Sequence, residues 1–239
     1  MGPPFEPMAT STLKWVTRKT AFLLTLATAK RNSEVHAFSA DVAFSQGHSD
    51  ATLSFLPAFI AKTTRLDRLD NTLDPITVPA LASSISDDLP DRTLCPVRSL
   101  RYYLDLTSGN KDLKYSKADP RPKRLFVSYK PGHRKDIYKT TVSGWIKATI
   151  REAYQSVKDE DIPHLSFPDC QARELRAIAT SLAFHQHHSL RQVMQAATWR
   201  NTGTFASFYL RDIPSLGVLS SLGPIVAAQV TLSGSHCPP

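Results

Sequence analysis

The sequence predicts a mostly helical α+β protein with a small antiparallel β-sheet or hairpin. Apolar residues recur at three- and four-residue intervals through much of the chain, which is the spacing of helices with one buried face. Two short β-type runs, 52–56 and 76–79, interrupt this pattern and flank an Asp-rich connection at 65–74. The 239 residues, of which 41% are hydrophobic, are sufficient to bury a core.

The elements expected in the N-terminal half follow from helix caps and apolar spacing. A first helix is expected after Ser11, a suitable N-cap, because the apolar residues from Leu13 to Leu26 keep the spacing of a buried helical face. A second, short helix is expected from Ser33, whose hydroxyl can cap it. The two β-type runs then pair as a hairpin with a long loop.

The rest of the chain is expected to be helical apart from one strand. Pro96 fits the first turn of a helix over 96–106, and residues 125–128 are expected to form a strand. A helix over 140–157 turns Trp145, Ile146, Ile150 and Tyr154 inward. After Pro168, apolar periodicity predicts three more helices, at about 171–184, 189–198 and 203–210.

One domain is expected to account for most of the chain. It spans 9–213, after a Pro-rich N-terminal extension at 1–8 and before a Leu-, Ser- and Gly-rich tail at 214–239, whose segment 219–230 could pack on the domain or on a neighbouring protomer. The most apolar window, 21–29, is too short for the roughly 20 residues that cross a bilayer, and the N-terminus lacks the pattern of a secretory signal. Three widely separated cysteines, Cys95, Cys170 and Cys237, predict reduced thiols in an intracellular protein.

The net charge of +8 is concentrated in one stretch of the chain. Residues 117–151 hold ten basic and two acidic side chains, whereas both flanks are close to neutral. A polyanionic partner is therefore expected, with nucleic acid ahead of an anionic membrane surface. We expect this stretch to face DNA phosphates, although an ordinary solvated surface is the alternative. The expected DNA contacts are Lys123, Arg124, Lys130, Arg134, Lys135, Lys139 and Lys147.

Residues suited to phosphate chemistry occur in a meaningful order along the chain. Two guanidiniums, those of Arg31 and Arg176, can clamp the charge that a phosphoryl transition state spreads over its oxygens. A tyrosine hydroxyl such as that of Tyr209 can form a phosphodiester that keeps the bond energy for rejoining. A lysine amine, for which Lys62 is the candidate, can protonate the departing oxygen, and Trp199 precedes the tyrosine.

This ordered set resembles the signature of tyrosine recombinases, the phage-integrase family, in which Arg, Lys, His-x-x-Arg, His or Trp, and Tyr follow one another. The resemblance covers about residues 9–213 and implies a catalytic domain with the DNA breaking-rejoining fold shared with type IB topoisomerases. The segments 29–35, 175–181 and 199–212 are most similar to recombinases of eukaryotic mobile elements such as DIRS-type retrotransposons and Cryptons. DNA recombination and integration in the nucleus are the implied activity and place.

The resemblance implies a role for each matching residue. Arg31 and Arg176 would bind the scissile phosphate, and Lys62 on the β-hairpin would be the general acid. Trp199 would donate its indole N–H or pack beside the phosphate, and Tyr209 would be the nucleophile of a 3′-phosphotyrosyl link. The implied partners are double-stranded DNA and other protomers of a recombination complex, with no metal, cofactor, small-molecule substrate or membrane.

Two departures from the family pattern bear on activity, while Glu34 matches it as a support for the helix that carries Arg31. Arg173 stands where the family has the His of His-x-x-Arg. Arginine stays protonated at pH 7 and cannot serve as a base, although it could add a third phosphate contact. The chain also begins almost at the first catalytic helix, so the core-binding domain of complete family members is expected to be missing or supplied by another polypeptide.

Several alternatives stay open. The chain could be a catalytically impaired DNA-binding remnant, a topoisomerase-like relaxing enzyme or, more distantly, a basic RNA-binding or membrane-surface protein. Lys30, Lys130 and Lys135 compete with Lys62 for the role of proton donor. The cluster of His185, His187 and His188, with His164 and Cys170 nearby, fits no standard ligand spacing, and we expect no metal site there.

Overall fold

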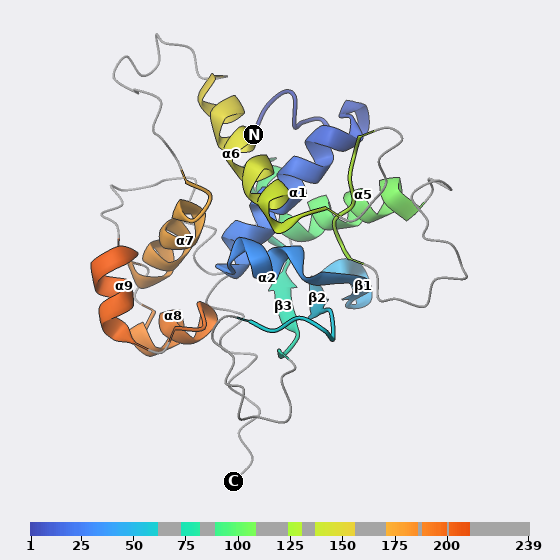
Figure 1. Cartoon of the computed structure of the whole chain (residues 1–239). Helices are drawn as coiled ribbons and strands as arrows, with labels where there is room; N and C mark the ends of the chain where they lie inside the picture. The colour runs from blue at the N-terminus through green and yellow to red at the C-terminus, as the bar shows by residue number, and fades with distance from the viewer. Residues whose placement is uncertain are drawn as a thin grey trace.

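The structure is a computed structural model that describes residues 1–61, 73–81, 89–108, 124–130, 137–155, 171–185, 188–199 and 201–210. Within these ranges it is mostly helical with one small antiparallel sheet, as the sequence predicts (Figure 1). The helices are α1 (Leu13–Thr28), α2 (Asn32–His36), α4 (Leu89–Leu94), α5 (Pro96–Ser108), α6 (Lys139–Gln155), α7 (Glu174–His185), α8 (Leu190–Ala196) and α9 (Thr202–Phe208). The strands are β1 (Phe38–Phe44), β2 (Asp50–Phe55) and β3 (Ile76–Pro79), and short 3₁₀ turns lie at Met8–Thr10 and Gln46–His48.

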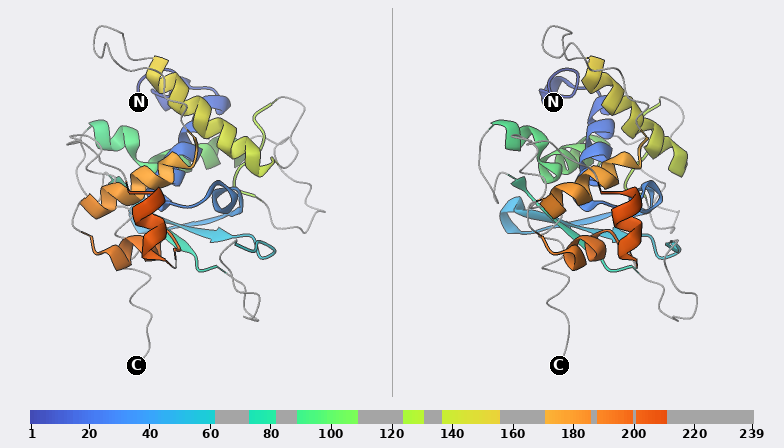
Figure 2. Two further views of the ribbon diagram at one scale, coloured as in Figure 1. Left: turned by 60° about the vertical axis from the view of Figure 1, so that its left-hand side comes forward. Right: turned by 90° about the vertical axis from the view of Figure 1, so that its left-hand side faces the viewer.

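Helix α1 is the central helix, in contact with α2, α5, α6, α7 and β3. It buries threonines as well as apolar residues, because each threonine hydroxyl donates to the carbonyl four residues earlier, as Thr20 does to Val16 at 2.8 Å. Thr20 also meets the hydroxyl of Ser99 on α5 at 2.8 Å. The helix ends at Ala29, whose φ of 50° turns the chain sharply toward α2. Figures 1 and 2 show α7, α8 and α9 gathered together on one side of this core.

The sheet has the order β1-β2-β3, with β2 paired antiparallel to both neighbours. The predicted pairing of 52–56 with 76–79 is confirmed, since Thr52 lies opposite Thr77 and Leu53 opposite Ile76. The predicted loop at 65–74 lies outside the described residues except for its last two positions. Strand β1 was not predicted, although the alternation of Phe38, Ala40, Val42 and Phe44 is the signal that indicates it.

Residues 125–128 do not form the predicted strand. Isolated bridges at Arg124 and Val127 stand in its place, the first with Ser39, and the Leu125 N–H donates to the Phe38 carbonyl at 2.8 Å. The side chain of Tyr103 on α5 replaces a strand partner: its hydroxyl donates to the Leu125 carbonyl and accepts from the Val127 N–H, each at 3.1 Å. Both backbone groups are thus satisfied without a ladder.

We expect Tyr103→Phe to lower the free energy of unfolding by about 1–3 kcal/mol, because it leaves these two buried backbone groups unpaired while preserving the ring. Urea unfolding followed by circular dichroism measures the change. Tyr138→Phe is the control, since that ring is 80% exposed and its change should stay within about 0.5 kcal/mol. Equal effects of the two substitutions would contradict this role of Tyr103.

The other predicted helices are confirmed with shifts of one to three residues at most of their ends, and α4 is an addition. Two predicted caps were wrong. Thr12 is the N-cap of α1, and Arg31 is the N-cap of α2 because Glu34 accepts its backbone N–H. Trp145, Ile146 and Ile150 are buried as predicted, and Tyr154 packs at the edge of the core. None of the described helices has the length and apolar content needed to cross a lipid bilayer. The tail at 214–239 lies outside the described residues.

Candidate functional site

Arg31 lies at the junction of α1 and α2, where the turn at Ala29 places it at the start of the second helix. Glu34 holds it there by accepting the Arg31 backbone N–H at 2.6 Å, and its other oxygen lies 3.4 Å from Arg31 Nη1. The carboxylate of Glu34 is buried, whereas the Arg31 side chain keeps partial access to solvent. Glu34 therefore contacts both the backbone and the side chain of Arg31.

Arg176 on α7 is the most unusual charged group of the site, since it is only 3% exposed. Its Nη2 donates to the carbonyl of Ala197, but Nε and Nη1 are buried without a hydrogen-bond partner among the described residues. The pKa of Arg176 is lowered to about 10, mainly by burial and also by the charge of Arg31, against the opposing effects of Glu34 and Tyr209. The guanidinium is still charged at neutral pH, and these two donor groups have no partner in the described part of the chain.

Two aromatic rings pack on this guanidinium. The Arg176 Cζ lies 4.8 Å from the ring centroid of Trp199 and 5.8 Å from that of Tyr209. The two rings also touch, with centroids 4.5 Å apart and planes at 44°. The Ser181 hydroxyl donates to the Tyr209 carbonyl at 3.0 Å, which ties the end of α9 to α7. Arg176, Trp199 and Tyr209 therefore form one cluster from three separate segments.

The predicted site residues fall into two groups in the structure. The first group lies together. Trp199 and Tyr209 pack on Arg176, and Arg31 and Glu34 contact each other and are close enough for their charges to change the pKa of Arg176. Lys62 lies outside the described residues. Arg173 does not turn into the cluster: its side chain is 76% exposed and its Nε lies 3.7 Å from Glu174.

The predicted DNA contacts are placed in part. Lys130 and Lys139 are exposed and Lys147 is half-buried on α6, while Lys123, Arg134 and Lys135 lie outside the described residues. Arg124 is half-buried, and its Nη1 donates to the carbonyl of His36 at 3.1 Å. The Arg124 guanidinium thus contacts the backbone at the end of α2, in addition to its predicted contact with DNA.

Lys30 also lies in this region. From the sequence it was considered only as an alternative to Lys62 for the role of proton donor. It is 9% exposed, and its Nζ donates to the Ala196 carbonyl at the end of α8, 3.1 Å away. A cavity of about 240 Å³ lies beside it, between α2, the start of β3 and the end of α8. Lys30, Glu34, Phe55, Asp74, Gln195 and Thr198 are among its lining residues.

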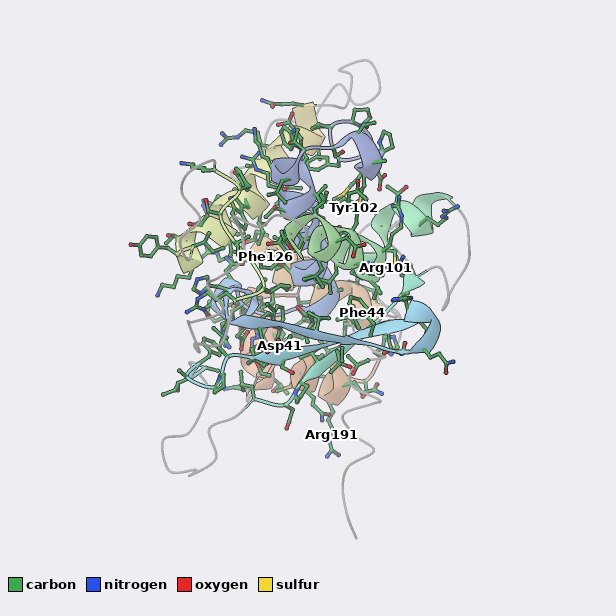
Figure 3. The ribbon with its side chains drawn as sticks, turned by 90° about the vertical axis from the view of Figure 1, so that its right-hand side faces the viewer. Asp41, Phe44, Arg101, Tyr102, Phe126 and Arg191 are labelled. Atoms are coloured by element: carbon green, nitrogen blue, oxygen red, sulfur yellow. The ribbon has the colours of Figure 1, made fainter. Side chains whose placement is uncertain are left out.

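A second, larger cavity of about 480 Å³ lies elsewhere and contains none of the predicted site residues. It is bounded by the N-terminal segment, the β1–β2 turn and α5. Figure 3 shows this side of the molecule, with Arg101 and Tyr102 on α5, which line the cavity, and Phe44 on β1. Among the described residues no group of three His, Cys, Asp or Glu side chains is arranged to hold a metal ion, and His164, Cys170 and His187 lie outside them.

Comparison with known proteins assigns no family to this chain. No model of a known protein family matches it. No curated protein sequence matches it either. The functional argument therefore depends on the residues of the cluster and their geometry.

Proposed function

We propose that this chain cuts and rejoins DNA strands through a 3′-phosphotyrosyl intermediate formed on Tyr209. The observation that carries the proposal is the state of Arg176, a buried guanidinium on which the Tyr209 ring packs and whose Nε and Nη1 have no partner in the part of the chain that the structure describes. An unpaired buried charge is costly unless a ligand neutralises it. A group of this kind beside a phenol fits a site that receives an anion next to a nucleophile.

The chemistry of the free donors favours phosphate over other anions. Two N–H groups of one guanidinium match two oxygens of a phosphodiester as a parallel pair of hydrogen bonds. The nearby charge of Arg31 adds to the positive potential, as its effect on the pKa of Arg176 indicates. The exposed Lys130 and Lys139 supply further charge for the flanking DNA backbone.

The proposed step is a transesterification. The Tyr209 hydroxyl gives its proton to solvent water and its oxygen attacks the scissile phosphorus, while the bond from phosphorus to the 5′ oxygen breaks. The departing 5′ oxygen takes up one proton, for which Lys62 is the proposed donor. In the reverse step a 5′ hydroxyl attacks the phosphotyrosine and releases Tyr209, so bond energy is kept and no nucleotide is consumed. Recombination needs several protomers on two duplexes, and assembly of this chain is part of the proposal.

The expected result on a nicked duplex is a covalent protein–DNA adduct that Tyr209→Phe abolishes. The substrate is a pool of duplexes with a randomised centre and a single nick, so that the short fragment released on cleavage diffuses away and rejoining is blocked. Denaturing gel electrophoresis of labelled DNA measures the adduct. Tyr138→Phe is the matched control, since that exposed tyrosine should leave the yield unchanged. An adduct that persists in Tyr209→Phe contradicts the proposal.

A catalytically impaired DNA-binding remnant is the second candidate, and the exposure of Arg173 favours it. That side chain turns to solvent and stands at the position where the resemblance implies a histidine. Such a remnant binds the labelled duplexes in a gel-shift assay and yields no adduct with any variant. The same DNA pool therefore separates the two candidates.

A further inference from the structure

Two backbone hydrogen bonds close the C-terminal turn of α8, and the carbonyls of Ala196 and Ala197 take no part in them. The Trp199 N–H donates to Met194 O at 2.8 Å and the Thr198 N–H to Gln195 O at 3.0 Å, which is the Schellman pattern. The pattern requires a left-handed residue, and Thr198 takes that place with a φ of 54°. A β-branched residue is strained there, so other contacts must hold the turn in place.

Each of these two carbonyls accepts a hydrogen bond from a cation, and the Ala197 carbonyl also accepts one from the Thr198 hydroxyl at 2.7 Å. Lys30 Nζ donates to Ala196 O at 3.1 Å, and Arg176 Nη2 donates to Ala197 O. Both contacts are buried and both place a positive charge at the negative end of a helix. Arg176 uses Nη2 for its contact, and its Nε and Nη1 have no hydrogen-bond partner within the described ranges.

We propose that Lys30 is a positioning residue, which caps α8 together with Arg176 and thereby holds Trp199 against Arg176 and Tyr209. Trp199 directly follows the capped turn, and its ring packs on both the guanidinium and the Tyr209 ring. The consequence for DNA cleavage rests on the proposed function, whereas the positioning of Trp199 does not.

The charges around Lys30 make this contact sensitive to pH. Glu34 of α2 and Asp74 before β3 favour the ammonium, while Arg31 of α2 and Arg176 of α7 oppose it. Burial is the largest effect, and the pKa of Lys30 is lowered to about 8. Lys30 is therefore charged at pH 7 and loses its charge as the pH rises through about 8, which weakens a charge-assisted hydrogen bond to Ala196.

The direct test follows the indole N–H resonance of Trp199 by ¹⁵N NMR on the full chain, with Trp199→Phe to assign it. We expect the resonance to shift between pH 6.5 and 9.5 with a midpoint near 8, as the pKa of Lys30 requires. In Lys30→Arg, which stays charged, the shift should disappear while the resonance keeps its low-pH position. In Lys30→Gln and Lys30→Met it should lie at a different position that does not change with pH.

The control is Lys147→Met on α6, which should keep the titration. Circular dichroism confirms that each variant is folded, and Lys30→Gln replaces Lys30→Met if the latter is not. The proposal is overturned if Lys30→Arg titrates as the unchanged protein does, or if neither Lys30→Gln nor Lys30→Met moves the resonance.

Adduct formation on the nicked DNA pool gives the second readout. At pH 7 we expect Lys30→Met to give about tenfold less adduct than the unchanged protein, and Lys30→Arg to give as much. At pH 9 we expect the unchanged protein to lose its adduct yield and Lys30→Arg to keep it. An adduct that forms equally well with all three proteins overturns the link to catalysis. If no protein forms an adduct, the proposed function fails while the titration of Trp199 still decides the role of Lys30.

Discussion

The Arg176→Lys protein is expected to form the covalent DNA adduct about 10²- to 10³-fold more slowly than the unchanged protein. Lysine keeps one positive charge but cannot present two parallel donors to two phosphate oxygens while a third holds Ala197. The rate of adduct formation on nicked duplexes measures the loss. Arg173→Lys is the control at the start of α7, and its exposed side chain should make its effect far smaller.

The stability of an Arg176 variant separates a ligand-binding arginine from a structural one. We expect Arg176→Met to lose little stability in phosphate-free buffer, because losing the contact with the Ala197 carbonyl is offset by removing a buried charge whose Nε and Nη1 have no partner among the described residues. Inorganic phosphate should then raise the Tm of the unchanged protein and leave that of Arg176→Met where it is. A large fall in Tm for Arg176→Met without phosphate would mean that Arg176 serves the fold.

The largest loss of stability is expected from Glu6→Gln, at about 3–5 kcal/mol. Glu6 forms an ion pair with Lys19, whose side chain is completely buried in α1, and a second one with Arg98 of α5 at 2.8 Å. Removing the carboxylate charge leaves the Lys19 ammonium buried without its counter-ion. Urea unfolding at pH 7 measures the difference. Glu174→Gln is the control, since its pair with Arg173 is exposed and is worth about 0–1 kcal/mol.

The same pair predicts a dependence of stability on acid. Burial raises the pKa of Glu6, but hydrogen bonds from Arg98 and Lys19 outweigh it, and the net pKa lies below the ordinary value of 4.5. The carboxylate therefore stabilises the fold fully above pH 4.5, and this contribution is lost as the pH falls through the lowered pKa. Stability curves for the unchanged protein and Glu6→Gln should converge in this range. Curves that stay parallel below pH 4.5 would show that Glu6 makes no such contribution.

Local patterns in the sequence are sufficient to predict much of the secondary structure, and the failures have identifiable causes. Helices such as α5 and α6 follow from apolar spacing and from a proline at the first turn. The segment after Arg124 was predicted as a strand because it is apolar and β-branched in part, but the Tyr103 hydroxyl satisfies its backbone instead. Tyr103 lies 22 residues from Leu125, and no local pattern signals such a contact.

The candidate site divides in the same way. The sequence by itself determined which residue types are present and their order, and these singled out Arg31, Arg176, Trp199 and Tyr209. In the structure Arg176, Trp199 and Tyr209 are in contact, and the charge of Arg31 acts on Arg176. Only the tertiary structure decided which donors of Arg176 lack a partner among the described residues, that Arg173 turns to solvent, and that Lys30 contacts a helix end 166 residues away. The physical reason is that periodicity and capping act within a few residues, whereas burial and charge pairing depend on segments that become neighbours only when the chain folds.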